Sequence, residues 1–180
     1  MGIDLWFFII TAALLSIERI SYAYIWRFPE SFRAFCNRSR IIPLGEPVDA
    51  LRRLFYGFKI IQLTVFFGWC YVFGEGSLSP FNGGVLSIIT GSVLIIIGQI
   101  LNFSVFYRLG KVGVFYGNKF GYDVPRSNDF PFKLCNHPQY IGTLMSIWGF
   151  FVVMRYPFDD WVVLPALQTV YYILGTYFEQ

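Results

Sequence analysis

The stretch VLSIITGSVLIIIGQILNFSVFY at residues 85–107 decides the fold class of this chain of 180 residues. It contains no Asp, Glu, Lys or Arg, and most of its residues are apolar. An α-helix needs about 20 predominantly apolar residues to cross the hydrocarbon core of a bilayer, and this run exceeds that length. We therefore predict that residues 85–107 form a helix that spans a membrane.

Four further apolar runs extend the pattern, at residues 5–25, 54–73, 140–154 and 161–178. The first two are also long enough for a span, whereas the run at 140–154 is short enough to lie at the interface instead. We predict an all-α integral membrane protein with four to five transmembrane helices. No polar linker, charge block or internal repeat divides the chain, so we treat residues 1–180 as one domain.

The composition agrees with a membrane protein and excludes several functions. Charged residues make up 14% of the chain, against about 25% in an ordinary soluble domain. The basic residues fall between apolar runs rather than along a polar face rich in aromatic residues, which argues against nucleic-acid binding. An odd number of cysteines, with no C-x-x-C pair and a single histidine, predicts neither a disulfide framework nor a metal site.

The distribution of Lys and Arg predicts the topology. The connections at residues 26–53 and 108–139 hold six and five of the 14 basic residues, whereas residues 74–84 hold none. Because positive charge in short loops stays on the cytoplasmic side, we expect both basic connections and the C-terminus in the cytosol and the N-terminus on the opposite side. The first apolar run lacks a basic leader and a small-residue cleavage site, so we expect a retained segment rather than a signal peptide.

Three charged residues lie inside the apolar runs. Arg19 and Lys59 are expected near cytoplasmic helix ends, where long cationic side chains snorkel to the interface. Glu18 and Arg19 are interpreted as an interfacial ion pair, with a role at a lipid headgroup as the alternative.

The connection at residues 108–139 is too long for an ordinary structureless loop unless it is functional. Its glycines can bring the backbone close to a ligand, and its aromatic rings can stack on a flat base or attract a cation. The alternative is an interfacial loop whose aromatic side chains lie at headgroup level.

The only histidine, His137, lies in the stretch NHPQYIG at residues 136–142. Asn136 and Gln139 have the spacing of a capping box, and Pro138 suits a helix start. A lone histidine is more often structural, yet a helix N-terminus also suits an anionic ligand group. Glu179, at the end of the last run, is either an exposed terminal residue or a carboxylate that faces a ligand.

Several pieces together resemble the phospholipid methyltransferase family. They are GQILNF at residues 98–103, LGKVGVFYGNKFG at 109–121, FPF at 130–132, NHPQYIG at 136–142 and FE at 178–179. The sequence departs from some family members at Ile96-Ile97-Gly98, where they have Gly-x-Gly, and at Glu179-Gln180, where they have two acidic residues.

The resemblance implies a helical membrane enzyme that binds S-adenosylmethionine at the cytosolic ends of its last helices. Residues 85–180 would form the cofactor-binding core and residues 1–84 the N-terminal helices. The cofactor contacts implied for this chain are Gly98, His137, Pro138, Tyr140, Gly142, Glu179 and Gln180.

The implied reaction is N-methylation of phosphatidylethanolamine or its mono- and dimethyl derivatives, leading to phosphatidylcholine. His137 and Glu179 are candidates to position the cofactor or to accept a proton, and the rings of Tyr116, Phe120, Tyr122 and Tyr140 are candidates to hold the methylated ammonium. The substrate would be an aminophospholipid of the bilayer, without a metal, and the resemblance suggests the endoplasmic reticulum. Whether the protein is a homo-oligomer stays open.

Three alternatives remain at this point. The wider group includes isoprenylcysteine carboxyl methyltransferases, which would change the acceptor to a carboxylate. A membrane reductase of the sterol type is distantly similar in its last helices. A small structural or lipid-binding membrane protein would use its glycines only for helix packing.

Overall fold

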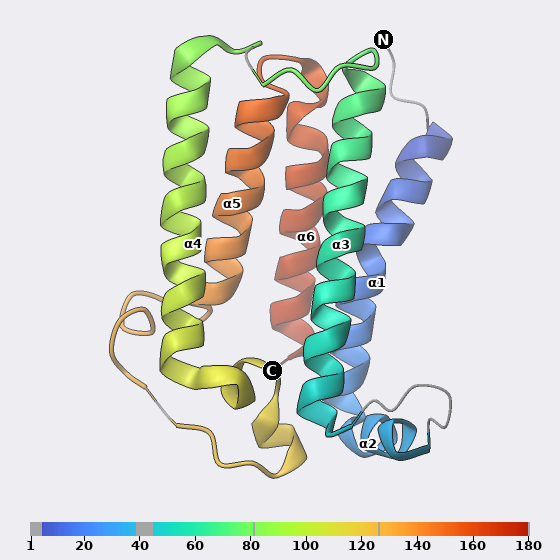
Figure 1. Cartoon of the computed structure of the whole chain (residues 1–180), viewed down its shortest axis with the longest axis vertical. Helices are drawn as coiled ribbons and strands as arrows, with labels where there is room; N and C mark the ends of the chain where they lie inside the picture. Colours follow the sequence, from blue (N-terminus) through green and yellow to red (C-terminus); the bar gives the residue numbers. More distant parts are fainter. Residues whose placement is uncertain (1–4, 39–44, 81, 126, 180) are drawn as a thin grey trace.

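A computed structural model describes residues 5–38, 45–80, 82–125 and 127–179, and the described part of the chain is helical without a strand. Five long helices run side by side, and a short one lies across one end of the bundle (Figure 1). The helices are α1 (Leu5–Arg27), α2 (Pro29–Arg38), α3 (Pro47–Phe73), α4 (Gly84–Val114), α5 (Pro138–Met154) and α6 (Val163–Phe178), with 3-10 helices η1 (Gly117–Phe120) and η2 (Asp159–Val162).

The prediction of an all-α membrane protein is confirmed. Three helical stretches are long and apolar enough to cross a membrane, at Leu5–Arg27, Pro47–Phe73 and Gly84–Phe120. The shorter apolar helix α5 has 17 residues and therefore a length of about 25 Å at 1.5 Å per residue. Each of the five predicted apolar runs coincides with one of the five long helices.

Two glycine pairs bring α4 and α5 into close contact. A Cβ atom on Gly149 would lie 2.5 Å from the carbonyl oxygen of Gly91, and a Cβ atom on Gly142 would lie 2.6 Å from that of Gly98. Real side chains do not approach so closely, and small residues are what allow membrane helices to touch along their backbones. The two helices therefore form one tightly packed wall.

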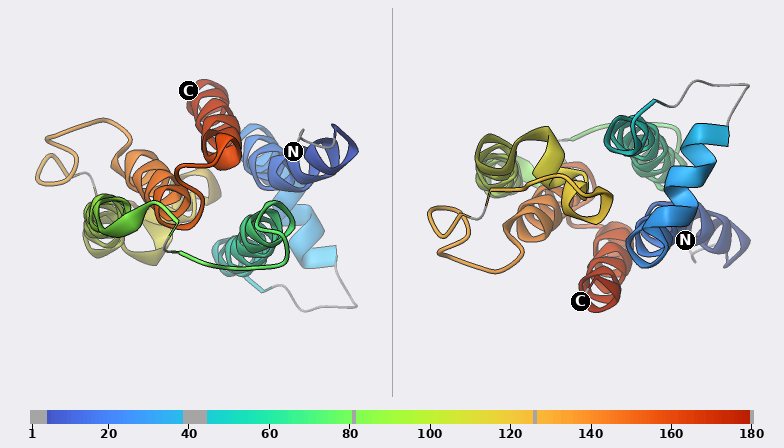
Figure 2. Two further views of the ribbon diagram at one scale, coloured as in Figure 1. Left: turned by 90° about the horizontal axis from the view of Figure 1, so that it is seen from above. Right: turned by 90° about the horizontal axis from the view of Figure 1, so that it is seen from below.

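The other helices are arranged around this wall. Helix α3 packs on α1, and α6 contacts both α1 and α5, so the α4–α5 pair and the α1–α3 pair are joined through α6. The views along the bundle show α1 and α4 toward opposite sides, with α3 between them (Figure 2). A core of buried aromatic and aliphatic side chains, including Trp69, Phe151 and Leu164, fills the space between α3, α5 and α6.

Both basic connections lie at the same end of the bundle. Helix α2 and the segment after α4 are found there together with the C-terminus, whereas the connections α3–α4 and α5–α6 lie at the opposite end (Figure 1). The predicted grouping of the connections is confirmed. The assignment of this end to the cytosol stays a prediction.

The two basic connections contain more helix than the sequence indicated. Helix α2 was not predicted, although Phe32 and Cys36 are spaced by four and form its buried face. Helix α4 continues beyond residue 107 to Val114, with a break at Gly110, whose φ of 62° and ψ of −176° suit glycine. Since η1 follows directly, residues 108–139 are not a structureless loop.

Candidate active site

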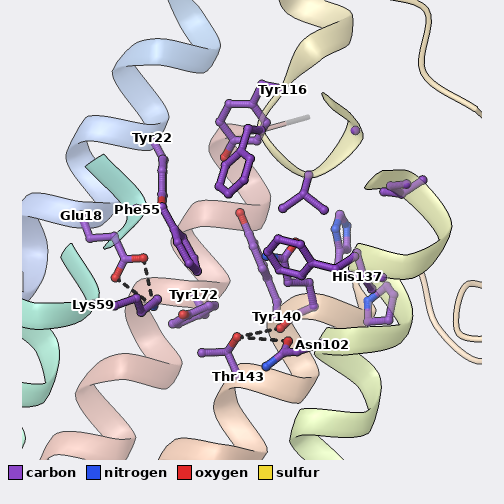
Figure 3. Close-up of a pocket in the computed structure, with 18 of the residues that line it drawn as sticks. Glu18, Tyr22, Phe55, Lys59, Asn102, Tyr116, His137, Tyr140, Thr143 and Tyr172 are labelled. Atoms are coloured by element: carbon purple, nitrogen blue, oxygen red, sulfur yellow. Dashed lines mark hydrogen bonds and ion pairs between the residues drawn. The ribbon is translucent and has the colours of Figure 1, made fainter. Parts of the chain in front are cut away.

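A large cavity lies inside the bundle at the end that carries the basic connections. Its volume is about 1150 Å³, which exceeds the range of about 300–1,000 Å³ that is typical of small-molecule sites. All five long helices and the segment after α4 contribute to its walls, as Figure 3 shows in close-up. Such a cavity has room for more than one ligand.

Glu179 is the acceptor of two phenol hydrogen bonds at the cavity wall. Tyr116 Oη donates to Glu179 Oε1 at 2.6 Å, and Tyr140 Oη donates to Glu179 Oε2 at 2.5 Å. The three residues come from the segment after α4, the first turn of α5 and the C-cap of α6. Three elements that are distant in sequence are thus tied together at one carboxylate.

His137 lies beside this group and lines the cavity. Its ring stacks on that of Tyr140, with 5.9 Å between the ring centroids. It occupies the N-cap position of α5 without a side-chain capping hydrogen bond, so the predicted capping box of Asn136 and Gln139 is wrong. The helix begins one residue later than expected because Pro138 occupies its first position, where the proline ring suits the helical φ.

Gly98 and Gly142 lie in the contact between α4 and α5 and not among the residues that line the cavity. Each faces the backbone of the other, and their immediate neighbours Gln99 and Thr143 do line the cavity. The two glycines therefore allow α4 and α5 to approach closely, and this spacing fixes the positions of the residues that line the cavity.

The aromatic residues of the segment after α4 divide between different surroundings. The ring of Phe120 is 4% exposed and packs on Phe32 of α2, with 6.0 Å between centroids, so the structure does not bring it into the cavity. Helix α2, which was not predicted, covers the ring, and the headgroup contact expected of Phe120 stays a prediction.

Tyr122 lies at the rim of the cavity, where its Oη donates to Glu46 Oε2 at 3.0 Å. This hydrogen bond raises the pKa of the Tyr122 phenol, because only the protonated form can donate it. Gln180 was expected as a further cofactor contact, and it lies outside the described residues.

A charged cluster forms the deep wall of the cavity on α1 and α3. Arg19 Nη2 pairs with Glu18 Oε1 at 2.8 Å, and Lys59 Nζ pairs with the same oxygen at 3.1 Å. Lys59 also donates to Gln62 Oε1 at 3.0 Å. The predicted ion pair of Glu18 and Arg19 is confirmed.

The predicted snorkelling of Arg19 and Lys59 is wrong. Arg19 lies about two turns before the end of α1, and Lys59 lies about three turns after the start of α3. The Arg19 guanidinium is held over the ring of Tyr172, 3.9 Å from its centroid, and both cations turn inward to Glu18. The Glu18 carboxylate holds both cations inside the bundle, and Arg19 also lies over the ring of Tyr172.

The opposite wall, on α4 and α5, is polar but uncharged. Gln99 Nε2 donates to Ser146 Oγ at 2.8 Å, and Thr143 Oγ1 donates to the carbonyl oxygen of Gln139 at 2.8 Å. Figure 3 shows Thr143 next to Asn102, apart from Glu18 and Lys59. The cavity thus has one charged and one neutral polar wall at membrane depth.

The sequence contained a signal for these walls that was not used. Polar residues recur three positions apart inside three of the apolar runs, as Lys59 and Gln62, Gln99 and Asn102, and Thr143 and Ser146. Residues three apart lie on the same face of a helix, and polar groups inside a membrane helix usually face a cavity or another helix. Three such faces predict a shared polar interior.

Comparisons with known proteins identify the family of this chain. The sequence model of the phospholipid methyltransferase family matches residues 86–180, and the chain belongs to that family. The matched region contains α4, α5, α6 and the Glu179 group, whereas Glu18 and Lys59 lie before it.

Two curated relatives carry the same name. The chain is 29% identical over 126 residues to phosphatidyl-N-methylethanolamine N-methyltransferase of Arabidopsis thaliana, covering 70% of this chain and 67% of the relative. It is 38% identical over 60 residues to the Saccharomyces cerevisiae protein of that name, covering 33% of this chain and 29% of the relative. No solved structure matches the chain.

Proposed function

We propose that this protein is an S-adenosylmethionine-dependent N-methyltransferase that acts on phosphatidylethanolamine or its mono- and dimethyl derivatives, leading to phosphatidylcholine. The family and the names of the two relatives support the reaction class. The observation that carries the proposal is the Glu179 carboxylate, held by Tyr116 and Tyr140 at the wall of a cavity inside a membrane bundle.

The residues of the site fit the proposed donor. Glu179 is bonded to two neutral phenols, which satisfy its oxygens without compensating its charge. A partly buried carboxylate of this kind favours a cationic group or hydroxyl donors, and S-adenosylmethionine carries a sulfonium, an amino group and ribose hydroxyls. Glu179, Tyr140, His137 and Pro138 would hold the donor, while Gly98 and Gly142 would act through the spacing of α4 and α5.

Bound S-adenosylmethionine supplies an electrophilic methyl group that an amine nitrogen attacks in line. The main demand on the protein is to hold the two reactants aligned at near-attack distance, which is worth several kcal/mol of the barrier. The walls of the cavity are built from closely packed helices, and they can provide this alignment.

The acceptor ammonium must lose a proton before its nitrogen has a lone pair. His137 is exposed at the cavity edge and Glu179 lies inside, so either can accept the proton directly or through water. The rings of Tyr116 and Tyr140 can stabilise the positive charge of the methylated nitrogen, and Tyr122 can do so at the rim. We favour Glu179 as a positioning residue, because two phenols already use its oxygens.

The proposal includes an orientation. The end with the Glu179 group would face the cytosol, with the N-terminus on the other side, because the basic connections gather there. The endoplasmic reticulum is the proposed membrane, by resemblance to eukaryotic relatives.

Methyl transfer to defined acceptors tests the proposal. Purified protein in mixed micelles should transfer labelled methyl groups from S-adenosylmethionine to at least one of phosphatidylethanolamine and its mono- and dimethyl derivatives. Glu179→Gln should weaken donor binding about ten- to hundredfold, since it removes charge-assisted hydrogen bonds. The same change at the exposed Glu75, at the other end of the bundle, should leave binding unchanged. Absence of both donor binding and transfer to every aminophospholipid would refute the proposal.

A further inference from the structure

The cavity reaches the surface in two places with different chemistry. At the end of the bundle, its exposed lining residues are mostly polar and include Asn118, Asp123, Asn136 and His137. On the side, its exposed lining residues are apolar or aromatic: Tyr56 (58% exposed) and Leu63 (51%) on α3, and Phe103 (70%) on α4. A polar opening suits a water-soluble molecule, and an opening rimmed by apolar side chains among lipid-facing helices suits a lipid.

The side opening lies between two helices that pack on different partners. Helix α3 packs on α1, whereas α4 packs along its length on α5, and the views along the bundle show α3 and α4 apart from one another (Figure 2). The two helices touch near the end with the basic connections, where Lys111 pairs with Asp49 at 2.6 Å and the rings of Phe55 and Phe106 lie 6.4 Å apart between centroids. Most of the contacts that hold each helix are made with α1 and α5. A hydrophobic chain that enters beyond these contacts, at Leu63, can pass between α3 and α4 without breaking either pair.

An apolar groove continues from this opening along the outside of α3. It has a volume of about 560 Å³, and Leu63 lines both the groove and the cavity. Leu63, Phe67 and Tyr71 are spaced by four and form one face of α3, a length of about 12 Å. This shape and chemistry match a fatty acyl chain.

The charged cluster stands directly inside the opening. Lys59 is three residues after Tyr56 and four before Leu63, so it belongs to the same face of α3. Lys59 and Arg19 share the single carboxylate of Glu18, which leaves one positive charge in excess in this wall. An uncompensated charge at membrane depth is costly and attracts an anion.

Two buried donors near the cluster also lack acceptors. Arg19 Nε and Gln168 Nε2 have no hydrogen-bond partner among the described residues, while Glu18 Oε1 is held by its ion pairs without a hydrogen bond. The side chain of Gln168 is 1% exposed and contacts Gln62, which lines the cavity. Buried polar groups are normally satisfied, and of these residues Arg19 lines the cavity whereas Gln168 does not. The unpaired Arg19 Nε therefore favours a ligand group with acceptor oxygens.

We infer that the acceptor phospholipid enters the cavity from the bilayer between α3 and α4, with an acyl chain in the α3 groove and its phosphodiester bound by Lys59 and Arg19. The inference rests on the proposed function, which supplies the phospholipid as substrate. The amine, a few bonds beyond the phosphate, then points toward the Glu179 group at the polar end. The carboxylate of the donor is the other anion that the cluster can attract, and the experiment separates the two.

The first test uses the phosphate. Lys59→Met should lower kcat/KM for monomethyl-phosphatidylethanolamine about ten- to hundredfold, mainly through KM, and Lys59→Arg should restore most of it. Donor binding without lipid should keep its wild-type Kd. The loss should disappear for an acceptor that carries the same amine on a diacylglycerol skeleton without a phosphate. An equal loss with this acceptor, or a weakened donor Kd, would assign the cluster to another role and overturn the inference.

The second test does not depend on turnover. A phosphatidylcholine with a photoreactive acyl chain, in nanodiscs, should label residues 60–71 more strongly than it labels the other lipid-facing helices. Leu63→Trp should reduce this labelling and raise KM for the lipid, because the larger ring fills the shared part of groove and cavity. Ile173→Trp is the matched control, since Ile173 is 60% exposed on α6 and lines neither site.

The outcomes distinguish the inference from the proposed function. If the wild-type protein methylates an aminophospholipid but labelling is uniform and the Lys59 and Leu63 variants behave like wild type, the inference alone fails. If labelling maps to α3 and Leu63→Trp blocks it while no acceptor is methylated, the lipid site stands and the proposed reaction fails.

Discussion

Two buried charged clusters lie inside the described part of this bundle, and they differ in how completely their groups are satisfied. At the end away from the cavity, Arg155 pairs with both oxygens of Asp160 at 2.6 and 2.8 Å, and Trp69 Nε1 donates to the same carboxylate at 3.0 Å. Arg155 also donates to the carbonyl oxygen of Phe73 at 2.8 Å. This cluster has one charge of each sign and connects three elements.

The cluster of Glu18, Arg19 and Lys59 has an extra positive charge, a donor without a partner and a cavity beside it. The first cluster has no net charge and its charged groups are hydrogen-bonded, whereas the second has an excess positive charge and a donor that is free to bind a ligand. The difference predicts that the balanced cluster stabilises the fold and that the unbalanced cluster binds a ligand. The following variants test this distinction, from the largest expected effect to the smallest.

Asp160→Asn should have the largest effect. It leaves the Arg155 guanidinium, which is 3% exposed, without its counter-charge, and removing one partner of a buried pair costs about 3–5 kcal/mol. The free energy of unfolding in mixed micelles should fall by that amount, while donor affinity of the folded fraction should stay at the wild-type value. Asp159→Asn is the control, because Asp159 is exposed and should change stability by less than about 0.5 kcal/mol. Equal effects of the two variants would remove the structural role of the Arg155–Asp160 pair.

Tyr140→Phe should act on binding more than on stability. It removes one of the two phenol hydrogen bonds to Glu179 and keeps the ring that packs on Tyr172. A hydrogen bond to a charged group contributes about 1.5–3 kcal/mol, so donor affinity should weaken about ten- to hundredfold. Binding measured by calorimetry provides the readout.

Tyr116→Phe is the matched variant, because it removes the other hydrogen bond to the same carboxylate. If the two phenols act together, the double variant should lose less than the sum of the single losses. Strict additivity would mean that each phenol acts alone.

Gly149→Ala and Gly142→Ala should separate packing from function within the α4–α5 wall. Each added methyl group would press on a backbone carbonyl of α4, and overpacking typically costs about 1–3 kcal/mol. Both variants should lose similar stability in a thermal unfolding experiment. Gly142→Ala should lower kcat/KM more than Gly149→Ala, since Gly142 adjoins Thr143 near the Glu179 group, whereas Gly149 adjoins Phe150, the last cavity-lining residue along α5. An equal loss of activity in Gly149→Ala would show that the spacing of α4 and α5 along their whole length, and not only near Gly142, determines the geometry of the site.

The five long helices and the pairing of Glu18 with Arg19 could be predicted from the sequence, but the joining of Lys59 to this pair could not. Apolar runs report membrane helices directly, because each helix needs its own length of apolar residues. His137, Tyr140 and Glu179 were found because a family resemblance links their spacing.

Lys59 and Glu18 are 41 positions apart, and their pairing depends on how α1 and α3 pack, which no local pattern states. The residue types also led to a wrong prediction for Arg19 and Lys59, since Arg and Lys near a helix end usually extend to the membrane interface. Helix α2 was missed because ten residues with a narrow apolar face resemble a polar connection.

Lys59→Met should have the smallest effect on stability and therefore tests the comparison most sharply. Arg19 alone can neutralise Glu18, so removing Lys59 leaves a balanced pair instead of an orphaned charge. The methionine keeps most of the apolar stem and loses only the ammonium. The free energy of unfolding should change by less than about 1 kcal/mol, against about 3–5 kcal/mol for Asp160→Asn, when both are measured in the same micelles without lipid substrate. A loss as large as that of Asp160→Asn would mean that the excess charge is itself structural, and the distinction between the two clusters would no longer hold.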